Sequence, residues 1–97
     1  MLVLGIDPGI AITGYGLIQT GPRNEQHCVG FGVVTTPAKL EDHERLKILY
    51  DELTVLISQH KPDSSAVEKL FFQKNVRTAI SVGQARGVAM LTLAQAG

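Results

Sequence analysis

The segment Leu2-Val3-Leu4-Gly5-Ile6-Asp7-Pro8-Gly9 predicts a buried strand that ends abruptly on a carboxylate. Its apolar residues run without polar alternation, which is typical of a strand covered on both faces. Pro8 and Gly9 favour a tight turn directly after Asp7. Residues 13–19 then predict a second strand that returns beside the first.

The carboxylate of Asp7 needs a partner if it lies at the tip of a central strand, because burying an unpaired charge is costly. A cation or a set of hydrogen-bond donors could fill this role. Asp7 could also accept backbone N–H groups within its own turn, as Asp often does before Pro-Gly. The segment alone leaves both interpretations open.

The rest of the chain predicts two further strands and two helices, and the first of these strands is irregular. The third strand, 27–35, carries two glycines, so we expect a bulge or an edge position. A helix follows Asp42, its expected N-cap, and ends before Pro62. A fourth strand covers 64–70 and a second helix covers about 75–96. This order predicts an α/β fold: an antiparallel meander of three strands, a helical crossover, and a parallel fourth strand beside the first.

Both predicted helices carry a stripe of similar residues at helical spacing. The first has an apolar stripe typical of packing on a sheet, formed by Leu46, Leu49, Tyr50, Leu53, Leu56, Ile57 and His60. The second has a stripe of small residues, formed by Ala79, Gly83, Gly87 and Ala94. Glycine costs a helix about 1 kcal/mol relative to alanine. We therefore expect the small stripe to face either the sheet or a second copy of the chain.

Length and composition indicate one globular domain without a membrane-spanning segment or an export signal. The chain has 97 residues, of which 44% are hydrophobic. Cys28 is the only cysteine, which excludes an internal disulfide and favours a reducing, cytoplasmic setting. We expect Cys28 to be a small core residue in its strand.

Charge is distributed unevenly although the formal net charge is zero. Residues 1–67 hold eight acids and five bases, whereas the last thirty residues hold one acid, Glu68, and four bases. These bases, Lys69, Lys74, Arg77 and Arg86, could meet the phosphates of a nucleic acid. A solvated helix face carries similar charges, so the pattern by itself does not decide between the two.

Two acids stand directly after predicted neighbouring strands. If strand four lies parallel to strand one, Asp7 and Glu68 end side by side at the same edge of the sheet. Like charges at that distance repel each other, and a bound divalent cation removes the repulsion. Carboxylate oxygens suit magnesium or manganese.

Five motifs occur together and in one order along the chain: Gly5-Ile6-Asp7-Pro8-Gly9, Thr13-Gly14-Tyr15-Gly16, Val67-Glu68-Lys69-Leu70-Phe71-Phe72, Lys74-Asn75 and Gly83-Gln84-Ala85-Arg86-Gly87-Val88-Ala89. This combination resembles RuvC, the family of bacterial Holliday-junction resolvases. The resemblance implies a ribonuclease H-like fold and a homodimer that nicks two opposed strands of a four-way DNA junction. It also implies magnesium-dependent hydrolysis with two metals per complete site (manganese as a substitute), and branch-migration motor proteins as partners.

The resemblance assigns roles to several residues. Asp7 would be the central metal-bridging acid and Glu68 the second ligand. Phe71 would stack on a junction base, while Lys74, Asn75 and Arg77 would contact phosphate.

The family's site also takes two acids from a later helix, and its sheet has a fifth strand. We therefore expect residues 1–97 to be the N-terminal portion of one ribonuclease H-like nuclease domain, truncated before these elements and inactive alone.

Two other functions are compatible with the residues. An actin-type ATPase or sugar kinase also begins with a strand, an Asp-x-Gly turn and a Thr-Gly pair. Pro8, the position of Glu68 and the Phe71-Phe72 pair favour the nuclease. A non-catalytic DNA-binding or assembly fragment would bind junctions without cleaving them, and it is the stronger rival for a chain of this length.

Overall fold

The computed structural model describes residues 1–68 and 76–97. They form a four-stranded sheet and two helices. In chain order the elements are β1 (Leu2–Asp7), β2 (Ile12–Thr20), β3 (Gln26–Thr35), α1 (Asp42–His60), β4 (Ser64–Val67) and α2 (Val76–Ala96). The predicted fold class and element order are confirmed. The ends of the predicted strand 64–70 and helix 75–96 that fall within 69–75 lie outside the described residues.

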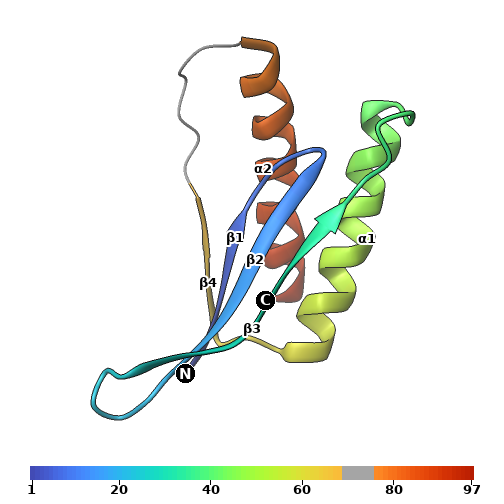
Figure 1. The fold of residues 1–97 in the computed structure, drawn as a ribbon. Coiled ribbons are helices and arrows are strands. Elements are labelled where there is room, and N and C mark those ends of the chain that lie inside the picture. Colours follow the sequence, from blue (N-terminus) through green and yellow to red (C-terminus); the bar gives the residue numbers. More distant parts are fainter. Residues whose placement is uncertain (69–75) are drawn as a thin grey trace.

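The sheet has the strand order β3-β2-β1-β4 (Figure 1). β1 pairs antiparallel with β2 and parallel with β4, so it is central in the described sheet. The connection from β3 through α1 to β4 is the predicted crossover, because a parallel strand cannot be reached by a tight turn. β3 lies at an edge and its register with β2 shifts between Leu17 and Ile18, which confirms the expected irregularity.

The core lies between the sheet and the two helices. Side chains alternate along a strand, so Leu4 and Ile6 of β1 point toward the helices with Leu17 of β2. α1 and α2 complete this cluster with the buried residues Leu49, Leu53, Leu56, Ile57, Ala85 and Ala89. Burying one leucine contributes about 1.5–3 kcal/mol. The apolar stripe of the first helix therefore packs as predicted, except that His60 at its end is exposed.

The opposite face of the sheet is open among the described residues, so the expectation that β1 is covered on both faces is wrong for this part of the chain. Val3, Gly5 and Asp7 alternate with the buried residues of β1 and belong to this face. On β3 the same face carries Phe31, which is 83% exposed, and Val33. Both helices pack on the other side (Figure 1).

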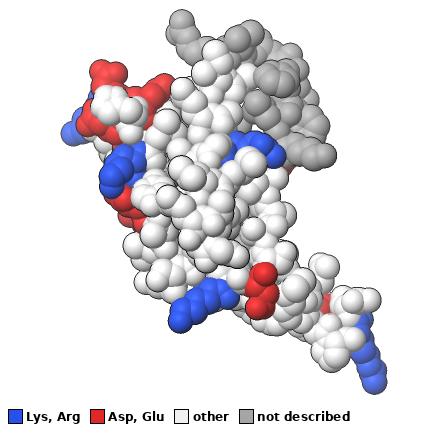
Figure 2. All heavy atoms as spheres, turned by 180° about the vertical axis from the view of Figure 1, so that it is seen from behind, with Lys and Arg blue, Asp and Glu red and all other residues white. Residues whose placement is uncertain are grey.

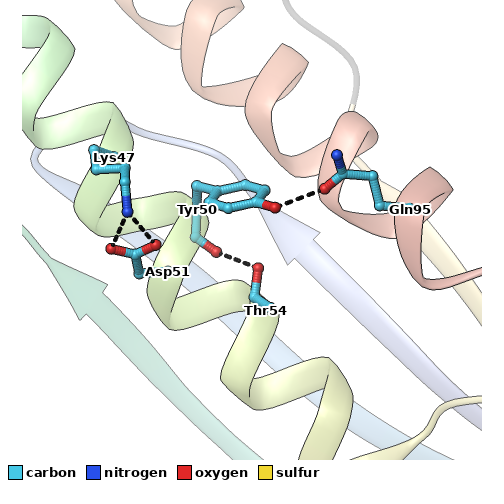
Figure 3. Close-up of polar contacts among 5 residues, drawn as sticks. All are labelled: Lys47, Tyr50, Asp51, Thr54 and Gln95. Carbon is cyan, nitrogen blue, oxygen red and sulfur yellow. Dashed lines mark hydrogen bonds and ion pairs between the residues drawn. The ribbon is translucent and has the colours of Figure 1, made fainter.

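A side-chain contact joins the two helices near their outer surface (Figure 3). The Tyr50 hydroxyl of α1 donates to Oε1 of Gln95 on α2 at 2.8 Å. Lys47 and Asp51 form an exposed ion pair one turn apart on α1, with a separation of 2.7 Å. Such a pair stabilises a helix by about 0.3–0.5 kcal/mol. The packing of the helices depends mainly on the core rather than on these contacts.

The ends of α1 differ slightly from the prediction. Glu41 has the extended conformation of an N-cap, with φ −67° and ψ 155°, whereas Asp42 is already helical. The carboxylate of Glu44 accepts the Glu41 N–H at 3.3 Å, as in a capping box. Asp42 is therefore not the N-cap. At the other end Lys61 adopts the left-handed conformation just before Pro62, so the predicted end is confirmed.

Cys28 is exposed, so its expected place in the core is wrong. It lies toward the hairpin end of β3, where β2 and β3 project beyond the helices (Figure 1). Neither of the two described helices covers this part of the sheet, so a residue there stays accessible despite its strand pattern.

The small-residue stripe of α2 is only partly buried. Among the residues of this helix whose side chains are described, Ala79, Ala85, Ala89 and Thr92 are buried and Gly83 is half-buried, whereas Gly87 and Ala94 are exposed. A Cβ atom added to Gly87 would meet nothing within 4 Å. The expectation that the stripe faces the sheet is therefore wrong for Gly87 and Ala94, and the alternative, a second copy of the chain, stays a prediction. Within the described residues, neither helix is long and apolar enough to cross a membrane.

Candidate active site

Strand pairing brings Asp7 and Glu68 to the same edge of the sheet. Ile6 and Val67 are partners in the parallel register of β1 and β4, and each acid is the next residue along its chain. The backbone N–H of Glu68 donates to the carbonyl oxygen of Ile6 at 2.9 Å, which continues the ladder past the end of β4. The predicted convergence of the two acids is confirmed at the level of the backbone.

Both acids line one open cavity of about 510 Å³ on the uncovered face of the sheet. Gly5, Gly14 and Gly16 form part of its lining, because β1 and β2 pair Gly5 with Gly16 and Asp7 with Gly14. A Cβ atom at Gly5 or Gly16 would meet nothing within 4 Å, so these positions leave the sheet surface bare. A bare backbone surface beside two carboxylates gives a bulky ligand room to approach them.

The turn after Asp7 is built around Thr13, which has no exposed surface. The Gly9 N–H donates to the Thr13 hydroxyl at 3.2 Å, and that hydroxyl donates to the Gly9 carbonyl oxygen at 2.6 Å. A Cβ atom at Gly9 would collide with the carbonyl oxygen of Ile12. Because Thr13 rather than Asp7 satisfies Gly9, the alternative in which Asp7 caps its own turn is not supported at this amide.

Asp63 lies away from the two acids, at the start of β4. Its carboxylate accepts the Leu2 N–H at 2.8 Å, and its own N–H donates to the Leu2 carbonyl oxygen at 2.8 Å. Asp63 therefore fastens the beginning of β1 to the beginning of β4, as its position in the sequence indicates.

Arg86 has a contact that sequence reasoning missed. Its Nε donates to the backbone carbonyl oxygen of Glu68 at 3.2 Å, so α2 holds the end of β4. The sequence placed Arg86 only among bases that could meet phosphate. The contact joins a loop to a helix eighteen residues later, and no local pattern indicates such a pair.

The donor set suits a hard divalent cation but is incomplete. Asp7 and Glu68 offer carboxylate oxygens, which magnesium and manganese prefer. No group of three or more His, Cys, Asp or Glu residues that could hold a metal occurs in the described part of the chain. Two carboxylates can contribute to such a site, and water or further protein ligands would have to fill the other positions.

The predicted DNA contacts are mostly beyond what the structure describes. Phe71, Lys74 and Asn75 lie outside the described residues, and for Arg77 only its place near the start of α2 is described. Figure 2 shows the helix-covered side of the molecule, on which Lys and Arg side chains are scattered rather than gathered in one patch. The described residues therefore leave these DNA contacts as predictions.

Comparisons with known proteins agree with this geometry. The family described as "Crossover junction endodeoxyribonuclease RuvC" matches residues 3–97. The chain is 51% identical over 96 residues to the protein of that name from Halothermothrix orenii, and 48% identical over 97 residues to that from Pelotomaculum thermopropionicum. These matches cover 99% and 100% of this chain and 58% of each relative, so the chain spans little more than half their length.

The solved structures lead to the same family. The structure of Thermus thermophilus RuvC in complex with a Holliday junction substrate matches this chain with a TM-score of 0.90 at 28% identity. That match covers 100% of this chain and 61% of the other. The resemblance inferred from the motifs is confirmed, and the assignment disfavours the ATPase interpretation. The chain belongs to the RuvC family of crossover junction endodeoxyribonucleases.

Proposed function

We propose that this chain forms the N-terminal part of a metal-dependent endonuclease that resolves four-way DNA junctions by paired nicks. The observation that carries the proposal is the parallel pairing of β1 with β4, which brings Asp7 and Glu68 to one edge of an open, glycine-lined surface. The family assignment supports the reaction class, and the Thermus relative bound to a Holliday junction substrate supports the substrate.

The roles of the residues follow from their positions. Asp7 and Glu68 would hold magnesium, with manganese as a substitute, and two ions would complete the site. Bound divalent cations supply charge that stabilises an in-line displacement at phosphorus and activates water. The glycine surface gives the DNA backbone room beside the acids. Phe71 would stack on a junction base, and Lys74, Asn75 and Arg77 would bind phosphates near the start of α2.

The family also supports a homodimer as the acting form, because paired nicks on opposed strands need two sites. Cooperation with branch-migration motor proteins and a cytoplasmic location are further parts of the proposal. They rest on the family resemblance and, for the location, on the single cysteine of the chain.

The test is a labelled four-way junction incubated with magnesium or with a chelator. A full-length resolvase that contains this chain should nick the junction only with magnesium, and Asp7→Asn should abolish nicking. The 97 residues alone should not cleave, because two carboxylates do not position a metal pair. Metal-dependent nicking by the 97 residues that disappears in Asp7→Asn would contradict the need for further acids. Junction binding without cleavage by the full-length protein would favour the non-catalytic alternative.

A further inference from the structure

The connection between β1 and β2 is held from outside its own hairpin. Thr36, the first residue after β3, donates its hydroxyl hydrogen to the carbonyl oxygen of Ile10. The Thr36 N–H also donates to the carbonyl oxygen of Ala11 at 3.1 Å. Ile10 and Ala11 follow Asp7 within the same short connection, and Thr36 is only 8% exposed. Two hydrogen bonds from one buried residue therefore hold the later half of this connection.

Arg45 of α1 fixes the direction of the Thr36 hydroxyl. Its Nε donates to the Thr36 hydroxyl oxygen at 2.9 Å, and its Nη2 donates to the Thr36 carbonyl oxygen at 3.5 Å. A guanidinium group can donate but cannot accept. The hydroxyl must therefore accept from Arg45, and its own hydrogen is left for Ile10. A charged donor also strengthens the hydrogen bond that the polarised hydroxyl makes in turn.

The hydroxyls of two buried threonines thus form hydrogen bonds with successive residues of the connection. Thr13 binds both polar backbone groups of Gly9, and Thr36 binds the carbonyl oxygen of Ile10. Asp7 precedes this clamped stretch and is separated from it only by Pro8, whose ring fixes its own φ angle. The backbone that follows Asp7 is consequently held directly by contacts from β2 and from the residue after β3, and α1 supports it indirectly through the contact of Arg45 with Thr36.

We propose that Arg45, acting through Thr36, is a positioning residue for the carboxylate of Asp7. This inference rests on the proposed role of Asp7 as a metal ligand. Partners that are hydrogen-bonded directly to a ligand change metal affinity or activity by about 10–100-fold when they are removed. Arg45 and Thr36 act one step further out, through the backbone that follows Asp7, so we expect the lower end of that range. The network therefore should affect how well the site holds its cation, beyond its effect on the stability of the fold.

The variants are made in a full-length resolvase that contains this chain. Thr36→Val removes the hydroxyl and keeps the shape, whereas Thr36→Ser keeps the hydroxyl. Arg45→Met removes the donors and leaves the hydroxyl in place. Thr92→Val is the matched control: Thr92 is 3% exposed, and its hydroxyl donates to the Val88 carbonyl oxygen at 2.7 Å within α2. Each variant is compared for thermal stability, for Mn²⁺ affinity by electron paramagnetic resonance, and for the magnesium dependence of junction cleavage.

We expect Thr36→Val and Arg45→Met to weaken Mn²⁺ binding about tenfold and to raise the magnesium requirement by a similar factor. Thr36→Ser should restore both values, and Thr92→Val should leave both unchanged even where it lowers stability. Equal metal affinity in Thr36→Val, Arg45→Met and Thr92→Val would overturn the inference. If the parent itself neither binds Mn²⁺ nor cleaves, the proposed function fails as a whole.

Amide hydrogen exchange offers a readout that needs no metal. The Gly9 amide should exchange faster in Thr36→Val and in Arg45→Met than in Thr92→Val. If Thr36→Val fails to fold, Arg45→Met still decides the question, because it leaves the buried hydroxyl intact. Unchanged Gly9 exchange in a folded Arg45→Met variant would count against a clamp that extends from α1 to the turn.

Discussion

The hydrogen bond from the Glu68 N–H to the Ile6 carbonyl oxygen, 2.9 Å long, extends the parallel ladder of β1 and β4 by one step beyond Val67. This hydrogen bond fixes the positions of the Asp7 and Glu68 backbones at the edge of the sheet. The distance between their Cα atoms depends on strand pairing and not on the path of a loop. Because backbone pairing sets this distance, replacing either acid side chain should change the site without changing the fold.

The first prediction concerns the acids themselves. In a full-length resolvase that contains this chain, Asp7→Asn and Glu68→Gln should each reduce metal-dependent cleavage by at least about 100-fold, because each removes a charged oxygen ligand. Asp63→Asn is the matched control, since it makes the same change where β1 and β4 begin. It should leave the magnesium dependence unchanged. A similar loss in Asp63→Asn would show that the effect is not specific to the site.

The second prediction separates two roles of Arg86. Because its guanidinium holds the Glu68 carbonyl oxygen, Arg86→Met should not change the salt dependence of junction binding. A residue that binds phosphate should lower the slope of log affinity against log salt by about 1 when it is replaced. Arg77→Met serves as the comparison, since Arg77 is a proposed phosphate contact. A reduced slope in Arg86→Met would place Arg86 on the DNA instead.

The third prediction concerns Gly87. In the 97-residue chain, Gly87→Ala should raise the free energy of unfolding by about 0.5–1 kcal/mol, since alanine favours the helix and the position is open. Gly87→Leu should also be tolerated in a single chain. In a full-length homodimer that packs through this stripe, however, Gly87→Leu should weaken association by roughly 1–3 kcal/mol. Light scattering gives the molar mass of the full-length protein and of its Gly87→Leu variant in solution. An unchanged dimer in the variant would exclude Gly87 from the interface.

The fourth prediction tests the core that supports the sheet. Leu53→Ala should lower the free energy of unfolding by about 2–5 kcal/mol, because Leu53 is fully buried between the sheet and the helices. Val55→Ala, on the exposed side of the same helix, should change it by no more than about 0.5 kcal/mol. Chemical denaturation of both variants gives the comparison.

The sequence predicted well where local patterns and chain topology act together. The apolar run before Asp7 and the shorter one before Glu68 indicate strands, and the crossover rule makes them neighbours. The sequence alone therefore predicted that Asp7 and Glu68 lie at the same edge of the sheet. Their metal-binding role stays a prediction, as do the roles of Phe71, Lys74 and Asn75.

Features that depend on tertiary packing could not be predicted in the same way. Cys28 has the pattern of a core residue but lies where the hairpin extends beyond the helices. Gly87 belongs to a regular stripe, yet the buried side of α2 is the one that carries Ala85 and Ala89. The hydrogen bonds from Arg45 through Thr36 join a helix, the residue after an edge strand, and a turn. No sequence pattern in any of these segments indicates that it contacts the other two.

The mixed pairing of β1 has a consequence for the order of folding. Its antiparallel partner β2 follows after a short turn, whereas the parallel ladder joins Leu2 to Asp63 across a separation of 61 residues. Closing a long loop costs entropy before any contact offsets it, so distant strand pairs form slowly. The β1–β2 hairpin that carries Asp7 should form early, and Glu68 should join Asp7 only when β4 docks. During refolding of a full-length resolvase that contains this chain, tight Mn²⁺ binding should therefore appear no earlier than the docking of β4.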